Sequence, residues 1–304
     1  MTDLFPGESG AALAAHAVNN LGQVAGTNHW SPTRGGLSGC FWDEGSVTEL
    51  GLNTAAYGIN DSGQVVGCLI NGTSTAFLWD PVGGMRDLGY IPSVGTGWTE
   101  ARAINNLAQV VGFDGVPGEI AGFGGEAFLW QDGVGMRGLG SMIAGGMSRA
   151  NGINNASQVV GVAQTQHGRA AFVWDSAAGM VDLGALGSTG EGTDLSEAFG
   201  INDVGQIVGK SNGRAFLWEG GHMEDLTGLL DDSGSAWREL DCAYGINANG
   251  WIVGEGTTWY TDAWGTHEVE HAFLAAPTAV PEPFALGLCA AGLGLALRRM
   301  RKGS

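Results

Sequence analysis

The sequence has few basic residues for its length. Lys and Arg together number 13, against 31 Asp and Glu, so the 304 residues carry a formal net charge of −18. A surface of that sign repels phosphate backbones, and nucleic acid is therefore not an expected partner. The acidity is expected to serve solubility, although cation binding or repulsion from an acidic matrix would also account for it.

Cysteine is also scarce, and no pair of cysteines has the CxxC spacing of a zinc site. The four thiols have no regular place in the chain, so a disulfide framework is not indicated; they are Cys40, Cys68, Cys242 and Cys289. Cys40 stands where comparable segments carry Phe. We therefore predict that it packs in an apolar core.

Glycine, in contrast, is abundant, with 55 residues. Because the glycines have no three-residue period, they do not indicate a collagen-like fibre. Each Gly inside a helix costs about 1 kcal/mol relative to Ala, so this composition favours short strands joined by tight turns. The expected fold class is all-β.

One segment recurs six times, as a hydrophobic residue and Asn followed by a short turn and Gln-Val-Val-Gly or a close variant. The first copies read Val18-Asn-Asn-Leu-Gly-Gln-Val-Ala-Gly26 and Ile59-Asn-Asp-Ser-Gly-Gln-Val-Val-Gly67. The anchoring asparagines of the six copies are Asn19, Asn60, Asn105, Asn154, Asn202 and Asn247.

Two further signatures follow each anchor. The first is Ala-Phe-Leu-Trp, as at 76–79, and the second is Met-x-Asp-Leu, as at 85–88. Each repeat is thus predicted to form four short strands. Because the strand segments are nearly continuous apolar runs, we expect sheets that are covered on both faces, as in the blades of a propeller.

The anchor asparagines are predicted to form hairpin turns, because Asn tolerates positive φ and bonds its own backbone. Calcium binding is the alternative, but no turn has alternating oxygen ligands closed by a distant Glu. The Phe and Trp residues of the third strands are expected in the core. No metal or other cofactor is predicted.

The two ends of the repeat region suggest a closed ring. Met1-Thr-Asp-Leu4 is a copy of the Met-x-Asp-Leu signature of the fourth strand, whereas the last repeat stops after its Ala-Phe-Leu segment at Leu274. We predict a six-bladed β-propeller over residues 1–274, in which residues 1–5 add the outermost strand to the blade that begins at Tyr244.

The C-terminal region has a different composition. A linker at 275–283 contains Pro281, Glu282 and Pro283, and a charge-free run at 284–297 predicts a short apolar helix. The basic residues that follow are Arg298, Arg299, Arg301 and Lys302. Such a cluster holds its end of a membrane segment in the cytoplasm, which would place the repeats across the membrane. A poorly ordered or core-docked helix is the alternative.

These residues resemble two known patterns. The repeats are similar to the HAF-repeat family of exported bacterial proteins, and His271-Ala-Phe273 spells its name. The tail resembles a PEP-CTERM sorting signal. The resemblance implies recognition by an exosortase in the inner membrane of Gram-negative bacteria, processing near Pro-Glu-Pro, and association with exopolysaccharide and biofilm. The first residues do not resemble a secretory signal, so the expectation of export depends on the tail.

Two enzyme motifs are interpreted as coincidental. His267-Glu-Val-Glu-His271 matches a zinc-protease pattern that requires a helix, but it leads into a repeat strand. Extended positions four apart lie about 13 Å from each other, too far to share one zinc ion. Gly209-Lys-Ser-Asn-Gly213 matches a nucleophile elbow but lies between two repeat strands, so Ser211 is predicted to be a turn residue.

The favoured function is a non-catalytic, exported repeat protein of the cell surface or extracellular matrix. The alternative is a propeller hydrolase or lyase that acts on extracellular polysaccharide. Tryptophans outside the repeated positions could stack on sugars, or belong to loops that cover the ring. Those tryptophans are Trp30, Trp98, Trp237, Trp259 and Trp264, with Trp98, Trp259 and Trp264 taken as the candidate glycan contacts.

Overall fold

The computed structural model describes residues 13–28, 36–94, 98–115, 125–187, 195–231, 237–262, 265–277 and 300–302. These residues form six antiparallel sheets of four strands, one sheet after another along the chain. In all six sheets, the spatial order of the strands is their order in the sequence. The predicted all-β repeat fold is confirmed.

The bounds of the strands follow the predicted signatures closely. The first two sheets consist of β1 (Leu13–Val18), β2 (Val24–Asn28), β3 (Ser38–Asp43), β4 (Ser46–Leu52), β5 (Thr54–Ile59), β6 (Val65–Ile70), β7 (Ser74–Asp80) and β8 (Gly84–Asp87). The next two consist of β9 (Trp98–Ile104), β10 (Val110–Gly115), β11 (Glu126–Gln131), β12 (Gly135–Gly138), β13 (Ser148–Ile153), β14 (Val159–Thr165), β15 (Gly168–Asp175) and β16 (Gly179–Asp182).

The fifth sheet is followed by a short 3₁₀ helix, η1 (Leu226–Leu229), in which the backbone N–H of Thr227 donates to the side chain of the capping residue Asp225. The last two sheets consist of β17 (Ser196–Ile201), β18 (Ile207–Ser211), β19 (Arg214–Glu219), β20 (His222–Asp225), β21 (Trp237–Ile246), β22 (Ile252–Asp262), β23 (Gly265–Pro277) and β24 (Met300–Lys302).

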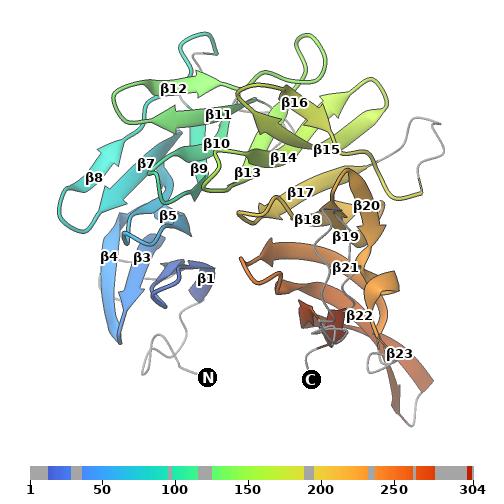
Figure 1. Ribbon diagram of the computed structural model, residues 1–304. Helices are drawn as coiled ribbons and strands as arrows, with labels where there is room; N and C mark the ends of the chain where they lie inside the picture. The colour runs from blue at the N-terminus through green and yellow to red at the C-terminus, as the bar shows by residue number, and fades with distance from the viewer. Residues whose placement is uncertain are drawn as a thin grey trace, which may run out of the picture.

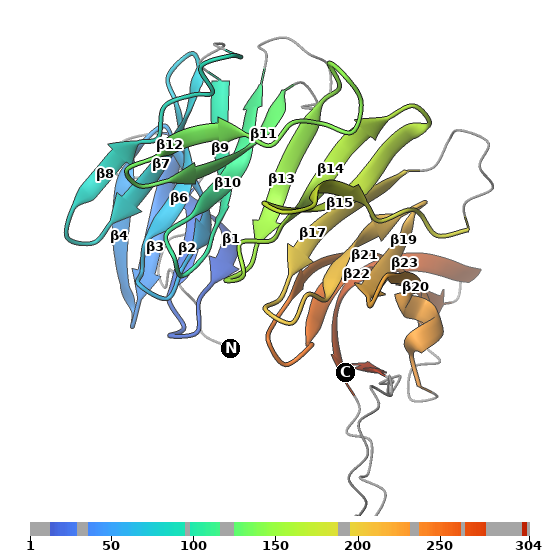
Figure 2. The ribbon, with the colours of Figure 1, turned by 45° about the horizontal axis from the view of Figure 1, so that its top comes forward.

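The six sheets follow one another around an arc, with their first strands on the inner side and their fourth strands on the outer side (Figures 1 and 2). The first and sixth sheets lie at the two ends of this arc. The arrangement is propeller-like. The sixth sheet differs from the others in its long hairpin, in which β22 and β23 pair from Ile252 and Ala275 out to Asp262 and Gly265.

The outermost strand of the sixth sheet comes from the C-terminal end of the chain. Met300–Lys302 pairs with β23 from Ala275 to Pro277. Two predictions need correction here: the first residues of the expected linker belong to a strand, and the last residues of the expected tail fill the sheet edge that was predicted for residues 1–5. Residues 1–5 themselves, and the predicted apolar helix at 284–297, lie outside the described residues.

The core consists of five apolar clusters, each formed between two neighbouring sheets. The Phe of every third strand is buried there, as predicted, at Phe41, Phe77, Phe128, Phe172, Phe216 and Phe273. The third-strand tryptophans are only partly as predicted: Trp130 and Trp174 are buried, whereas Trp42, Trp79 and Trp218 are half-buried. All six residues of β10 are buried, which confirms the prediction of cover on both faces for this central strand.

Buried cysteines behave as the sequence predicts. Cys40, Cys68 and Cys242 are all buried, and none of these three described cysteines is in a disulfide. Cys40 is 3% exposed. Its place in the core of the first sheet confirms the prediction of an apolar packing role, while Cys289 lies outside the described residues.

The anchor asparagines form the predicted turns and also join neighbouring sheets. In the second repeat, the Asn60 Oδ1 accepts hydrogen bonds from the backbone N–H groups of Ser62 and Gln64, at 3.1 and 3.0 Å. Its Nδ2 donates to the backbone carbonyl of Asn105 in the next sheet, at 3.1 Å. The same inter-sheet bond recurs from Asn19, Asn105, Asn154 and Asn202, each to the next anchor.

A second polar link recurs at the other end of the first strands. The hydroxyl of Thr99 accepts from the backbone N–H of Ala76 in the preceding sheet at 2.8 Å, and donates to the carbonyl of Gly89. Equivalent bonds are made by Thr54, Ser148 and Ser196. Because buried polar groups are costly when unpaired, these two links fix how each sheet sits on the next.

Candidate functional site

Every first strand carries a β-bulge at the same place. The pairing of β5 with β6 moves from Ala56 to Gly58, so that Tyr57 has no opposite residue. The same irregularity occurs in the other five sheets. The bulged residues are His16, Tyr57, Arg102, Asn151, Phe199 and Tyr244.

The bulge positions differ from the rest of the repeat in composition. Each lies three residues before an anchor Asn, between small residues such as Ala56 and Gly58. Small neighbours are needed, because a Cβ on Gly58 would lie 3.0 Å from the carbonyl oxygen of Arg102 in the next sheet. A bulge redirects its side chain, and bulges are common beside functional sites. The inner strands therefore present six large or polar side chains, which we call the bulge row.

The first half of the bulge row is an aromatic and cationic cluster. The rings of His16 and Tyr57 meet edge to face, with centroids 5.5 Å apart. The Arg102 guanidinium lies 4.7 Å from the Tyr57 ring centroid and pairs with Glu100 at 2.8 Å. Burial raises the pKa of the Tyr57 phenol above its usual value. This phenol therefore stays protonated and neutral near pH 7.

The second half of the bulge row combines aromatic rings with acidic groups. The rings of Phe199 and Tyr244 lie 5.6 Å apart. The Tyr244 hydroxyl donates to the Glu255 carboxylate at 2.7 Å. Burial, followed by this hydrogen bond, raises the pKa of Tyr244. Asn151 donates to the Glu197 carboxylate at 2.8 Å, so both acidic groups are already engaged.

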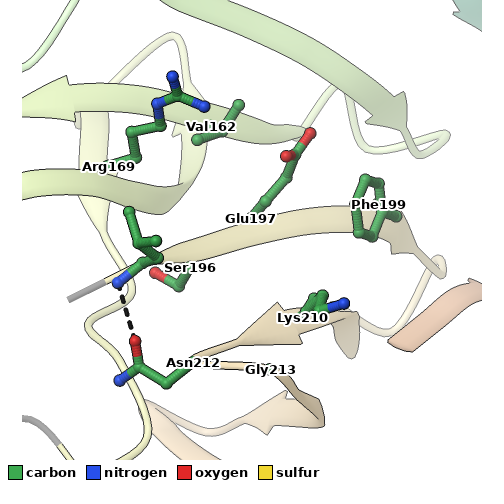
Figure 3. Close-up of a pocket in the computed structure, with 9 residues that line it drawn as sticks. Val162, Arg169, Ser196, Glu197, Phe199, Lys210, Asn212 and Gly213 are labelled. Carbon is green, nitrogen blue, oxygen red and sulfur yellow. Dashed lines mark hydrogen bonds between the residues drawn. The ribbon is translucent and has the colours of Figure 1, made fainter. Parts of the chain in front are cut away.

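A pocket of about 300 Å³ lies beside Phe199, between the fourth and fifth sheets. Figure 3 shows Val162 and Arg169 on the fourth-sheet side, the β17 side chains between, and Lys210, Asn212 and Gly213 on the fifth-sheet side. Apolar and polar groups are mixed, and Asn212 is held by a hydrogen bond from the backbone N–H of Leu195 at 3.0 Å. The pocket is suited to a small ligand that has both an apolar face and a charged group.

The serines near the pocket have structural partners. Ser211 is buried at the end of β18, where its Oγ accepts from the backbone N–H of Leu186 at 2.8 Å. The prediction that Ser211 is a turn residue is therefore wrong by one position, because the turn is formed by Asn212 and Gly213, both with positive φ. The prediction of a hairpin at this motif is confirmed. A Ser held in this way lacks the adjacent base of an activated nucleophile.

The zinc-protease motif lies in a strand, as predicted. His267 and His271 are both in β23, which is extended from Gly265 to Pro277. His267 contacts Asp262 across the hairpin, with 3.2 Å between Nε2 and Oδ1. Within the described ranges, no three His, Cys, Asp or Glu side chains are placed to hold a metal ion.

Trp98 and Trp259, two of the three candidate glycan contacts, are not brought together. Trp98 begins β9 in the third sheet, whereas Trp259 lies on the long hairpin of the sixth. Trp259 is 54% exposed, with the Arg238 guanidinium 5.3 Å from its ring centroid. Trp237 packs edge to face on Phe273. Trp30 and Trp264 lie outside the described residues.

The sorting motif cannot be placed. Pro281, Glu282 and Pro283, with Arg298 and Arg299, lie outside the described residues, while Arg301 and Lys302 belong to β24. No helix in the described portion of the chain has both the length and the apolar character needed to cross a membrane.

Sequence comparison provides no relatives: no protein-family model matches the chain, and no curated protein matches it. Two solved structures have a similar course of the chain. One is the extracellular domain of BT4673 of B. thetaiotaomicron, assigned as a one-component system, with 8% identity and a TM-score of 0.48 over 84% of this chain and 39% of that one.

The other solved structure is an acylaminoacyl peptidase of Pyrococcus horikoshii. It has 12% identity and a TM-score of 0.45, over 88% of this chain and 49% of the peptidase. The chain therefore spans less than half the length of either protein.

Proposed function

We propose that this protein is a non-catalytic, exported repeat protein that binds extracellular polysaccharide through the inner face of its sheets. The bulge row carries this proposal, because it places aromatic and charged side chains at positions where packing does not require them. The acidic groups beside the row already accept hydrogen bonds from it, as Glu197 does from Asn151 and Glu255 from Tyr244. Such a surface supplies stacking and polar contacts without a poised acid and base.

A binding assay tests this function against its alternative. The purified protein would be incubated with secreted polysaccharide from a biofilm-forming Gram-negative bacterium, and both co-sedimentation and new reducing ends or unsaturated products would be measured. We expect co-sedimentation without new ends. Accumulation of products with time would instead establish the hydrolase or lyase, and absence of both signals would refute the proposed function.

The cell-surface location belongs to the same proposal and depends on the tail. We expect an exosortase to recognise Pro281, Glu282 and Pro283 and to release the protein from an inner-membrane precursor. Co-expression with an exosortase should yield a product that has lost its last residues, as seen by intact mass. Replacement of the three motif residues by Ala should abolish that loss; an unchanged mass for the unmodified protein would argue against sorting.

Closure into a six-bladed propeller is also proposed. Five anchor asparagines donate to the next anchor, whereas the Nδ2 of Asn247, at the end of this series, donates no hydrogen bond to any described residue. Asn19 begins the series, and among the described residues its carbonyl accepts a hydrogen bond from Gly22 alone. A donor at one end of the arc and an acceptor at the other are what closure requires. Loss of the tail would also free the edge of β23 for residues 1–5.

Closure can be measured with paired cysteines. Asn20→Cys with Ala248→Cys should form an intramolecular disulfide, because these positions correspond to neighbours in the repeat series. The matched control is Asn155→Cys with Asp203→Cys, at positions whose side chains lie 2.8 Å apart. Crosslinking in the control pair alone would show that the ends do not meet.

A further inference from the structure

The pocket between the fourth and fifth sheets differs electrostatically from the rest of the chain. The chain carries a net charge of −18, yet Arg169 and Lys210 both line this pocket, with Glu197 as the single acidic side chain. Glu197 is neutralised by an ion pair with Arg149. The local charge is therefore positive, which favours an anionic ligand.

Lys210 is the group in this pocket that is available to a ligand. Its side chain is exposed and makes no hydrogen bond or ion pair with any described residue. The neighbouring polar groups are engaged: Ser196 donates to the carbonyl of Gly184, and Asn212 donates to that of Leu186. A single ammonium group acts as a point charge, and it suits one carboxylate better than a phosphate that needs several donors.

The apolar part of the pocket determines the rest of the ligand. Val162, Leu195 and Phe199 contribute hydrophobic surface, and Phe199 is held by its contact with the Tyr244 ring. A half-buried aromatic ring presents a flat face on which the C–H face of a sugar can stack. The volume of about 300 Å³ is at the lower limit for small-molecule sites, which corresponds to one ring rather than a long chain.

We propose that this pocket binds one carboxylate-bearing sugar residue of an acidic polysaccharide, with the Lys210 ammonium at the carboxylate and the Phe199 ring against the sugar. This inference rests on the proposed polysaccharide-binding function and names the class of polymer. Bound sugar would lie beside the bulge row, so a longer chain could continue along the inner strands towards Tyr244.

Calorimetric titration with two oligosaccharides of equal length tests the inference. One is an oligouronate, and the other is its neutral counterpart without carboxylates. The full chain should bind the oligouronate more tightly, and added salt should weaken that binding. Lys210→Gln should reduce affinity for the oligouronate by at least roughly tenfold, the lower end of the value of one charged hydrogen bond, and leave affinity for the neutral ligand unchanged.

Two variants complete the design. Phe199→Ala should weaken binding of both oligosaccharides by roughly two- to tenfold, because the stacking surface is shared. Arg86→Gln is the matched charge control, since Arg86 pairs with Asp132 away from the pocket and its removal should leave affinity unchanged. Lys210→Gln should keep the unfolding midpoint of the parent, because the exposed amine has no partner to lose.

The outcomes separate the inference from the proposed function. Equal binding of acidic and neutral oligosaccharides, with no effect of Lys210→Gln, would overturn carboxylate recognition while polysaccharide binding stood. Oligouronate binding that survives both pocket variants would place the site elsewhere. If neither oligosaccharide bound and whole secreted polysaccharide did not bind, the proposed function itself would be overturned.

Discussion

The inter-sheet interfaces and the inner face differ in how much their side chains vary from one repeat to the next. At the interfaces, equivalent positions keep nearly the same chemistry: a buried Phe in the third strands of five sheets, with the buried Cys40 in its place in the first, and an anchor Asn that reaches the next sheet. On the inner face, the equivalent bulge positions hold a different side chain in nearly every sheet. Packing positions are therefore uniform, and positions free of packing constraints are varied. Stability and binding can consequently be altered separately.

The largest expected effect is the contrast between two phenylalanines. Phe172 is fully buried between the third and fourth sheets, so Phe172→Ala should lower the free energy of unfolding by about 3–5 kcal/mol. Phe199→Ala, on the inner face, should cost about 1 kcal/mol, since its ring is half-buried. Urea denaturation measures both. Similar losses would remove the distinction between the two regions.

A smaller effect should separate the two roles of an anchor asparagine. Asn154→Asp keeps the oxygen that accepts from Ala156 and Gln158 but loses the Nδ2 donation to the carbonyl of Asn202. We expect a loss of about 1–3 kcal/mol, because a carboxylate then faces a buried carbonyl. Asn249→Asp is the control, in an exposed turn, and should change stability by less than about 0.5 kcal/mol. If Asn154→Asp left the free energy of unfolding unchanged, the hydrogen bonds within the turn would account for the whole contribution of Asn154 to stability.

The smallest effect concerns Asp61, which links the first three sheets. Hydrogen bonds from the backbone and side chain of Asn20, and from Asn106, lower the pKa of Asp61. A lowered carboxyl pKa stabilises the fold above the unfolded value of about 3.9 and ceases to do so as the pH falls through the folded value. Asp61→Asn should therefore make stability less dependent on pH below about 5. An unchanged acid limb in thermal unfolding would show that this link contributes nothing.

The repeat period made much of the fold predictable. Strand segments, hairpins and the buried third-strand Phe follow from local pattern, because strand pairing within each sheet is between neighbours in sequence. The inter-sheet role of the anchors was missed, since the Asn60 side chain reaches a carbonyl 45 residues away. Turn propensity explains only the hydrogen bonds that the Asn60 Oδ1 accepts within its own turn. Similarly, nothing local indicates that Met300–Lys302 pairs with β23.

The candidate site was predicted poorly, for a physical reason. A bulge places two residues opposite one, and that mismatch depends on the partner strand rather than on the bulged strand itself. A signal was nevertheless present: the position three before each anchor varies from His16 to Arg102 to Phe199 between constant small neighbours. Tryptophans outside the repeated positions were predicted as sugar contacts instead. Two of them, Trp98 and Trp259, lie in strands of different sheets.

Amide and side-chain chemical-shift mapping with an acidic polysaccharide fragment tests the central claim most directly, because it reports on every sheet at once. We predict perturbations along the inner strands β9, β13, β17 and β21, strongest at Phe199 and Lys210. Perturbations confined to the outer strands β8, β12 and β16, or to Trp98 and Trp259, would contradict the assignment of binding to the inner face.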